Sequence, residues 1–331
     1  MSKSNKLRVG TFNLYNLALP EVNYYPGRSY SEKEYYRKLN WIRHQMTKMR
    51  PDIMGMQEIF HDQCIEDLIA KKNYHFASGY TPPEKKGELS PFVGLLSKYP
   101  ILEKEVYTEF KSQLDVDDQL IPFKRFSRPI LRCRLEIKKD LEVDVFVSHL
   151  KSKRPIFPEH MEEQQVKDPI ELARGHARAL LKRSVEAVAL REILAGFIQH
   201  TDHPVIVLGD LNDSDRSTTT TIIQGDPPWA NERDLEKKKR IWDVLLYNVK
   251  NVQARRSYKD HYYTHIHNGH HEALDHILVS QEFHYHNQDG IGSIEYVRVF
   301  NDHLIDKTLT DEKVPRWKSD HAQVLATLEL K

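Results

Sequence analysis

The chain has 331 residues, of which 39% are hydrophobic and 29% are charged, and its formal net charge is +1. This composition is typical of a globular protein, and it excludes an integral membrane protein because no apolar run approaches the roughly 20 residues that cross a bilayer. The small net charge also excludes the strongly basic balance of many dedicated nucleic-acid binders, so contact with a polyanion would have to be local.

The N-terminal residues and the cysteines indicate the cellular compartment. The sequence from Met1 to Lys6 lacks the apolar stretch of roughly 7 to 15 residues that defines a secretory signal. The two cysteines, Cys64 and Cys133, lie in an amphipathic segment and a strand pattern, which does not suggest a disulfide framework. We therefore expect a cytoplasmic protein with free thiols.

The first predicted unit is a strand, a helix and a second strand. Apolar runs over 7–12 and 52–57 predict the strands, and between them apolar residues recur at helical spacing over 31–50. Ser31 and Glu34 have the spacing of a capping box, so we expect the helix to begin there.

The following segments are short and are expected to alternate in type. We predict a helix over 61–71, strands over 74–78 and 92–98, and a strand over 102–110 that pairs beside them. Two further apolar stretches, separated by a charged turn, predict a hairpin of strands over 129–137 and 142–150.

The second half of the chain holds longer helical patterns and two insertions. Residues 155–169 are polar with several prolines and predict a loop, and residues 170–200 predict a long helix. Residues 213–260 predict mostly helix and loop, including a helix over 237–249. The interleaving of strands and helices predicts an α/β protein. We expect a single domain over 1–331, with insertions near 151–169 and 213–260.

Several apolar strands carry polar residues at one end. These residues are Asn13, Glu58, His149, Asp210, Asn212, Asp275, Asp320 and His321. Strand residues two apart face the same side, so Asp210 and Asn212 are expected to point together while Leu211 turns into the core. The pattern suggests one shared rim where these side chains meet.

The ordered motifs carry a family resemblance. Asn13, Gln57-Glu58, Ser148-His149, Gly209-Asp210-Leu211-Asn212, Leu274-Asp275-His276 and Ser319-Asp320-His321 resemble the motif set of the endonuclease/exonuclease/phosphatase superfamily, typified by deoxyribonuclease I. The resemblance spans residues 7–328, and the order of six motifs makes it specific. It implies a four-layer α/β/β/α sandwich, in which two packed mixed β-sheets are flanked by helices.

The resemblance also implies a metal site. Hydrolysis of a phosphodiester needs a cation on the phosphate oxygens, an activated water and stabilisation of the leaving oxygen. Glu58 is the expected metal ligand, with Asn13 and Asp320 completing the site. Mg²⁺ suits such a site because this hard cation takes few carboxylates and keeps several waters. Mn²⁺ is a plausible substitute.

The remaining motif residues are implied to act in catalysis. Asp210 orients or deprotonates the attacking water, and Asn212 binds the phosphate without adding negative charge. Asp275 pairs with His321 and raises the pKa of the imidazole, so that the protonated ring stabilises developing charge. His149 matches a second histidine of deoxyribonuclease I-like members.

Two further residues are expected to bind substrate, and one is expected to position His149. Arg128 stands where an arginine contacts phosphate in some relatives, and Lys151 begins a basic stretch directly after the site. Glu88 is a candidate for orienting His149. Taken singly, each of these residues has an ordinary structural explanation as a turn former or a surface residue.

The His-rich stretch over 261–271 has two interpretations. Imidazole groups suit zinc, but no cysteine accompanies them. The alternation of His265 and His267 with Thr264 and Ile266 favours a half-exposed strand and turn, with a structural or substrate-contacting role.

Three functions remain open from the sequence. The leading hypothesis is a metal-dependent nuclease acting on DNA or RNA. The second is a phosphatase or phosphodiesterase for a small phosphorylated molecule, an inositol phosphate or a phospholipid head group, which the small net charge favours. The third is a binding module that has lost catalysis. The sequence does not indicate an oligomeric state.

Overall fold

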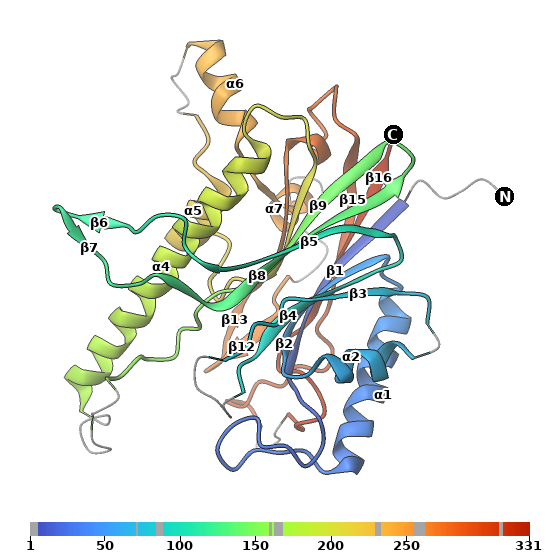
Figure 1. Ribbon diagram of the computed structural model, residues 1–331, viewed down its shortest axis with the longest axis vertical. Coiled ribbons are helices and arrows are strands. Elements are labelled where there is room, and N and C mark those ends of the chain that lie inside the picture. The colour runs from blue at the N-terminus through green and yellow to red at the C-terminus, as the bar shows by residue number, and fades with distance from the viewer. Residues whose placement is uncertain are drawn as a thin grey trace.

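Two six-stranded β-sheets form the centre of the molecule. The computed structural model describes residues 6–70, 72–83, 89–158, 161, 168–228, 233–254, 262–310 and 314–331. The first sheet contains β1 (Lys6–Leu17), β2 (Ile53–Ile59), β3 (His75–Ser78), β4 (Phe92–Ser97), β15 (Gly292–Phe300) and β16 (Gln323–Leu330), in the order β15-β16-β1-β2-β4-β3. Strands from both ends of the chain therefore lie side by side in this sheet (Figure 1).

The second sheet is built from the middle of the chain. It contains β5 (Ile101–Glu109), β8 (Arg125–Lys138), β9 (Leu141–His149), β10 (Val205–Asp210), β11 (Tyr247–Asn248) and β14 (Asp275–Val279), in the order β11-β14-β10-β9-β8-β5. Two small hairpins stand apart from it, formed by β6 (Asp115–Val116) with β7 (Gln119–Leu120) and by β12 (His265–His267) with β13 (His270–Glu272).

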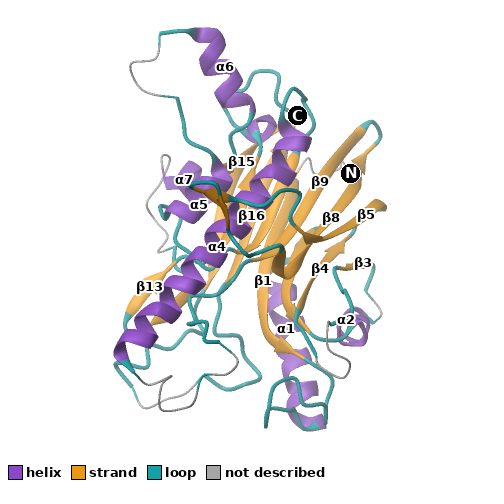
Figure 2. Cartoon of the chain, turned by 60° about the vertical axis from the view of Figure 1, so that its left-hand side comes forward, coloured by secondary structure: helices purple, strands orange, loops and turns teal. Residues whose placement is uncertain are grey.

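Helices cover the outer faces of both sheets. The helices are α1 (Glu32–Met49), α2 (Asp62–Ile69), α4 (Pro169–Ile198), α5 (Thr218–Gln224), α6 (Leu235–Asp243) and α7 (Val249–Ala254), with a 3₁₀ turn over Gln281–Phe283. Figure 2 shows the strands between α4 on one side and α1 on the other. The predicted four-layer sandwich with two mixed sheets is confirmed.

Three hydrophobic clusters separate these layers. One lies between the sheets and includes Val9 and Leu208. A second joins the first sheet to α1 and α2 and includes Ile42. A third joins the second sheet to α4 and includes Phe146 and Leu190. Burial of apolar area at about 25 cal/mol per Å² stabilises each contact between layers.

The helix predicted over 31–50 is confirmed, and its ends follow from local chemistry. The Ser31 hydroxyl accepts from the Glu34 amide while the Glu34 carboxylate accepts from the Ser31 amide, which completes the capping box. Arg50 ends the helix in the left-handed region with a φ of 51°.

The strand expected over 102–110 belongs to the other sheet. It was predicted to pair beside the strand over 92–98, but β5 pairs antiparallel with β8. The Ser97 hydroxyl bonds both the amide and the carbonyl of Tyr99, which turns the chain, and Pro100 has no N–H to continue a ladder. The chain therefore crosses from one sheet to the other at this point.

The helix expected over 237–249 is also wrong in its second half. α6 ends at Asp243, and Tyr247 and Asn248 instead pair with β14 as a short edge strand. Leu245 and Leu246 are buried, and the Leu246 amide donates to the Gln224 carbonyl. Burial and pairing with a sheet edge outweigh the local helical pattern here.

In the part of the chain that the structure describes, no helix combines the length and apolar character needed to cross a bilayer.

Candidate active site

The two sheets bring their polar strand ends together at one edge. β1 and β2 are parallel, as are β9 and β10, while β14 and β16 run antiparallel to β10 and β1. The C-terminal ends of the first four strands therefore lie beside the N-terminal ends of the last two. The sheets meet where the Asn13 amide donates to the Asp210 carboxylate at 3.1 Å.

The backbone leaves regular strand geometry at several of these positions. Glu58 and Asn212 have φ angles of 61° and 55°, and Tyr15 and Asn16 after Asn13 are also in the left-handed region. Each such residue costs about 1 kcal/mol relative to ordinary backbone. At Glu58 the cost is offset by a hydrogen bond of 2.9 Å from the Asn16 amide to its carboxylate. The strain lies where the candidate functional residues are.

Asn212 reaches the site by a different route from the one predicted. β10 ends at Asp210, so strand alternation does not apply to Asn212. Instead, the Asn212 amide N–H donates to the Asp210 carboxylate at 2.9 Å in a tight turn, and its side-chain Nδ2 donates to the Leu150 carbonyl at 3.0 Å. Leu211 turns into the core as expected.

Asp210 is the centre of the site. Its buried carboxylate lies 3.5 Å from His149 Nε2 and 3.8 Å from His321 Nε2, and it accepts hydrogen bonds from Asn13 and Asn212. Burial raises the pKa of Asp210 to about 7, because the protonated His321 offsets only part of the desolvation cost. A carboxyl group with such a pKa can exchange a proton near neutral pH.

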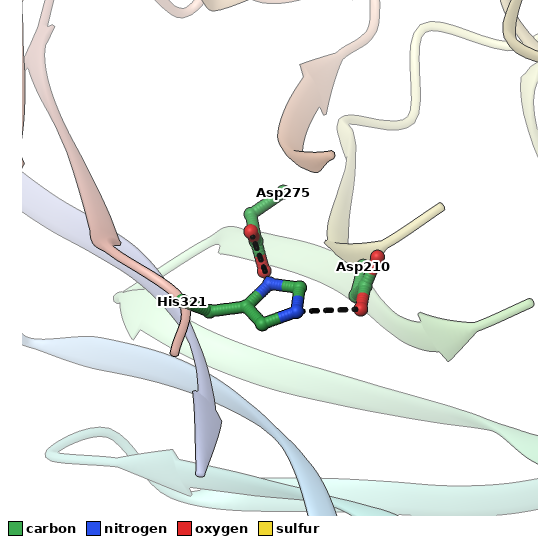
Figure 3. A group of neighbouring side chains, drawn as sticks. All are labelled: Asp210, Asp275 and His321. Atoms are coloured by element: carbon green, nitrogen blue, oxygen red, sulfur yellow. Dashed lines mark hydrogen bonds and ion pairs between the residues drawn. The ribbon is translucent and has the colours of Figure 1, made fainter. Parts of the chain in front are cut away.

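His321 is held in its charged form by two carboxylates. Its Nδ1 lies 2.8 Å from Asp275 Oδ2, and its Nε2 faces Asp210 (Figure 3). Burial disfavours the charged ring, but Asp275 and Asp210 outweigh burial and raise the pKa of His321 well above 6.5. The predicted carboxylate–imidazole pair is therefore present.

His149 has the opposite protonation state. Burial, together with the charges of Arg128 and His321, lowers its pKa well below 6.5. Its Nδ1 is buried and has no hydrogen-bond partner among the described residues. Glu88, the residue predicted to orient this ring, lies outside the described residues. A neutral and a charged imidazole thus face the same carboxylate.

Glu58 and Asp320 form a second acidic pair. Burial and the negative charge of Asp320 raise the pKa of Glu58. One oxygen of Asp320 is buried and has no hydrogen-bond partner in the described ranges. Asn13 Nδ2 lies 3.4 Å from Glu58, while the Asn13 oxygen accepts from the Tyr15 amide at 3.0 Å. The charges of Arg128 and His321 lower the pKa of Glu58 only in part, so this acidic pair suits a hard divalent cation.

A second group could also hold a cation. Asp210, Asp275 and His321 offer ligand atoms within 4.8 Å of one another. The protonated His321 already compensates these two carboxylates, and a protonated imidazole has no lone pair for a metal. Among the described residues, the His-rich stretch contributes no ligand to this group, and its structural or substrate-contacting role stays a prediction.

Arg128 and Lys151, which are predicted to bind phosphate, lie beside the site but already donate hydrogen bonds to backbone carbonyls. Arg128 Nη1 donates to the Leu150 carbonyl at 3.2 Å. Lys151 folds back so that its ammonium donates to the carbonyls of Ser152 and Arg154. Burial and the charge of Arg128 lower the pKa of Lys151 to about 8. The basic stretch is therefore less available than its sequence suggests.

Two buried residues of α4 support this region and were missed by the sequence analysis. Glu186 accepts from the backbone amides of Ser127 and Lys151, each at 2.7 Å. Arg183 donates to the Lys151 carbonyl at 3.3 Å. Both charged residues lie on the buried side of the helix, three residues apart. Two charged residues on the apolar face of a helical pattern are the signal in the sequence that could have identified them.

The sequence analysis also missed Lys38 of α1, another charged residue on the buried side of a helix. It is completely buried, and its ammonium donates to the carbonyls of Tyr15 at 2.9 Å and Arg316 at 3.2 Å. Burial lowers the pKa of Lys38 to about 7, although the charges of Asp320 and Glu58 oppose this shift. The lysine ties the end of β1 to the segment before β16.

A cavity of about 400 Å³ opens beside Asp320. It is lined in part by His265, His267 and Lys307. The His265 ring lies 5.0 Å from the His321 ring, and β12 is half-exposed as the alternation of the sequence predicted. The cavity offers room for a group attached to a phosphate at the centre of the site.

Solved structures show the same fold at low sequence identity. The human Nocturnin catalytic domain with bound sulfate anion is 14% identical, covers 100% of this chain and 97% of its own, and has a TM-score of 0.58. D. rerio TDP2 complexed with single strand DNA product is 14% identical over 98% of both chains, with a TM-score of 0.54. A family protein from Bacteroides thetaiotaomicron is 16% identical, covers 98% of this chain and 94% of its own, and has a TM-score of 0.54.

The sequence itself decides the family. No curated protein matches the chain. The model of the Endonuclease/Exonuclease/phosphatase family matches residues 10–321, which include every motif quoted above. With this match and the shared fold, the chain belongs to the endonuclease/exonuclease/phosphatase family.

Proposed function

We propose that the protein is a divalent-metal-dependent phosphoesterase that hydrolyses phosphodiester bonds in DNA or RNA. The observation that carries the proposal is the position of Asp210 between a neutral His149 and a protonated His321. Hydrolysis by water needs a proton acceptor and a proton donor at the same reacting centre. This arrangement provides both within one buried cluster.

Asp210 is the proposed general base. Its raised pKa of about 7 lets it take a proton from water at neutral pH. His321, charged and held by Asp275, is the proposed stabiliser of the negative charge that develops on the phosphate. His149 is the proposed neutral hydrogen-bond partner in the same cluster.

The phosphate is proposed to bind between Asn212, Arg128 and Lys151. Asn212 Nδ2 gives one N–H to Leu150 and keeps a second N–H for a phosphate oxygen. Arg128 and Lys151 supply positive charge on the same side, where both interact with the His149 ring.

Glu58 and Asp320 are proposed to hold the cation, with Asn13 fixing the Glu58 carboxylate. The bound ion supplies charge neutralisation on the phosphate oxygens. Mg²⁺ fits an oxygen-only set with few carboxylates, and Mn²⁺ is a suitable substitute.

Nucleic acid is the proposed substrate class. The solved structure of D. rerio TDP2 with a single strand DNA product has the same fold, which supports this choice. One observation favours the second candidate, a small phosphorylated molecule: Lys151 bonds its own loop, and Lys153 pairs with Glu272 at 2.6 Å. A surface that binds along a nucleic-acid backbone would keep such cations free of protein partners. The single-domain organisation and the cytoplasmic location stay predictions from the sequence.

A substrate panel tests the proposal. Single- and double-stranded DNA and RNA, an inositol phosphate and a phosphocholine ester are incubated with Mg²⁺, Mn²⁺ or a chelator. We expect metal-dependent cleavage of nucleic acid that is lost in His321→Gln and kept in His200→Gln, which changes an exposed histidine. Faster release of phosphate or phosphocholine would select the small-molecule alternative. No hydrolysis with any substrate would indicate a binding module.

A further inference from the structure

A second cavity lies outside the active site, between α1, β15 and the segment that leads into β16. Its volume is about 580 Å³, and its lining includes Trp41, Lys48, Arg298, Phe300, His303 and Lys318. None of these residues belongs to the catalytic cluster described above. The cavity is large enough for a small organic ligand.

The lining has an excess of positive charge. Lys48, Arg298 and Lys318 have no carboxylate within ion-pair distance among the described residues, and the lining contains a single acid, Asp302. The Arg298 guanidinium carbon lies 5.1 Å from the centre of the Phe300 ring, and the Lys318 ammonium lies 5.1 Å from the centre of the Trp317 ring. Unpaired cations around a concave surface attract an anion.

The cavity also presents aromatic surface. Trp41 is half-buried, and its ring makes T-shaped contacts with Phe12 and His303, with ring centroids 5.8 Å and 5.0 Å apart. A ring fixed on two sides is ordered before any ligand arrives, so a planar group can stack on it at low entropic cost. Cations beside an ordered aromatic ring suit a ligand that has both a phosphate and a planar ring.

We propose that this cavity is a second binding site, separate from the catalytic centre, for a nucleoside phosphate. The base stacks on Trp41, and the phosphate binds Lys48, Arg298 and Lys318. Asp302 is placed to accept a hydrogen bond from a sugar hydroxyl.

The cavity is connected to the segment that carries His321. His303 Nε2 lies 3.0 Å from the His321 carbonyl, and Lys318 precedes Ser319, whose hydroxyl bonds the His321 amide. A ligand in the cavity therefore contacts residues that position His321. This coupling rests on the proposed function, whereas binding itself does not.

Tryptophan fluorescence and calorimetry with adenosine monophosphate test the site. We expect one equivalent to bind outside the catalytic centre and to quench Trp41, with a loss of that signal in Trp41→Phe. Adenosine and inorganic phosphate are tested separately. Adenosine loses the charge-assisted contacts and inorganic phosphate loses the stacked base, so each is expected to bind roughly tenfold more weakly than the nucleotide.

Charge reversal gives the decisive comparison. The double variant Lys48→Glu with Arg298→Glu is expected to weaken nucleotide binding roughly tenfold or more. Lys33→Glu, an exposed lysine on the same helix, is the matched control and should bind as the wild type does. If the double variant unfolds, Arg298→Gln alone replaces it, because this side chain is exposed.

Three results would overturn the proposal: no nucleotide binding, binding that charge reversal leaves unchanged, or binding that His321→Gln abolishes. Equal affinity for inorganic phosphate and the nucleotide would overturn the assignment of Trp41 as the residue that binds the base. These readouts need no turnover, so they are independent of the substrate panel that tests the proposed function.

Discussion

Asp144 and Asp210 lie on neighbouring strands of the second sheet, and both are buried, yet their carboxyl groups behave in opposite ways. The Asp144 carboxylate forms ion pairs with Arg132 at 2.8 Å and Arg134 at 3.2 Å, and His203 Nε2 lies 2.7 Å from it. Burial alone would raise its pKa, but these partners outweigh burial and lower it. The pKa of Asp210 is instead raised to about 7, because burial is only partly offset.

The difference between the two ends of the sheet is the supply of positive charge. At the Asp144 end each buried carboxylate oxygen has a cation, so the cluster stabilises the fold. At the Asp210 end, four carboxylates (Glu58, Asp210, Asp275 and Asp320) lie near three cationic side chains (His321, Arg128 and Lys38), whose charges offset burial only in part at Glu58 and Asp210. Such an excess of negative charge lowers stability and leaves room for a metal ion and for proton transfer. Charge balance thus distinguishes a structural cluster from the candidate active site.

The largest expected effect comes from removing the central acid, with Asp210→Asn. Hydrolysis should fall by about 10²- to 10⁴-fold, because no other group at this position can accept the proton. The free energy of unfolding should stay the same or rise, because the removal of a desolvated charge outweighs the loss of the one oxygen that accepts from the Asn13 amide, while the other oxygen still accepts from Asn212. Turnover and calorimetric melting measure the two effects, and a lower melting temperature would contradict the charge-excess interpretation.

Asp144→Asn should have the reverse profile. We expect a loss of about 3 kcal/mol in the free energy of unfolding, because Arg132 and Arg134 lose a buried partner. Specific activity of the folded enzyme should not change. Urea unfolding measures the loss, and an unchanged midpoint would show that this cluster does not stabilise the fold.

The pH dependence of the same variant sharpens the contrast. In the folded state the pKa of Asp144 lies below its usual value of 3.8. The contribution of Asp144 to the free energy of unfolding is therefore complete above pH 3.8 and is lost as the pH falls through the lowered pKa. Between those two pH values, the free energy of unfolding should therefore fall less steeply on acidification in Asp144→Asn than in the wild type.

The smallest expected effect is at Glu186, the acid that holds two backbone amides near the site. Glu186→Gln keeps the shape but replaces one acceptor oxygen with a donor, so the Ser127 or Lys151 amide loses its partner. We expect kcat/KM to fall about threefold to tenfold, mainly through KM, because Arg128 and Lys151 shift.

Glu192→Gln is the matched control for Glu186 because it lies on the same helix, where it bonds Ser112 away from the site. If both variants bind substrate alike, Glu186 has no positioning role. A change confined to kcat would likewise argue against it.

Features that depend on neighbouring residues were predictable from the sequence. The helix over 31–50 follows from a capping box and apolar spacing that lie within the segment itself. The hairpin of β8 and β9 follows from two apolar runs joined by a short turn. The family match follows because Glu58, Asp210, Asp275 and His321 keep the motif order along the chain.

Features that depend on distant partners were not predictable. The strand over 102–110 joined the wrong sheet in our prediction because its pairing with β8 is decided at a turn that only the packed chain defines. The helix over 237–249 ended early because a sheet edge was available to it. Lys38 and Glu186 looked like ordinary helix residues until the backbone groups they bind were placed beside them.

The sequence by itself therefore determined the family, the α/β class with most of its strands and helices, and the chemical types of the candidate site residues. Tertiary structure alone decided the protonation states, since the same imidazole group is neutral at His149 and charged at His321. Electrostatic interactions and burial act through space, and chain order does not specify which charges lie a few ångströms apart.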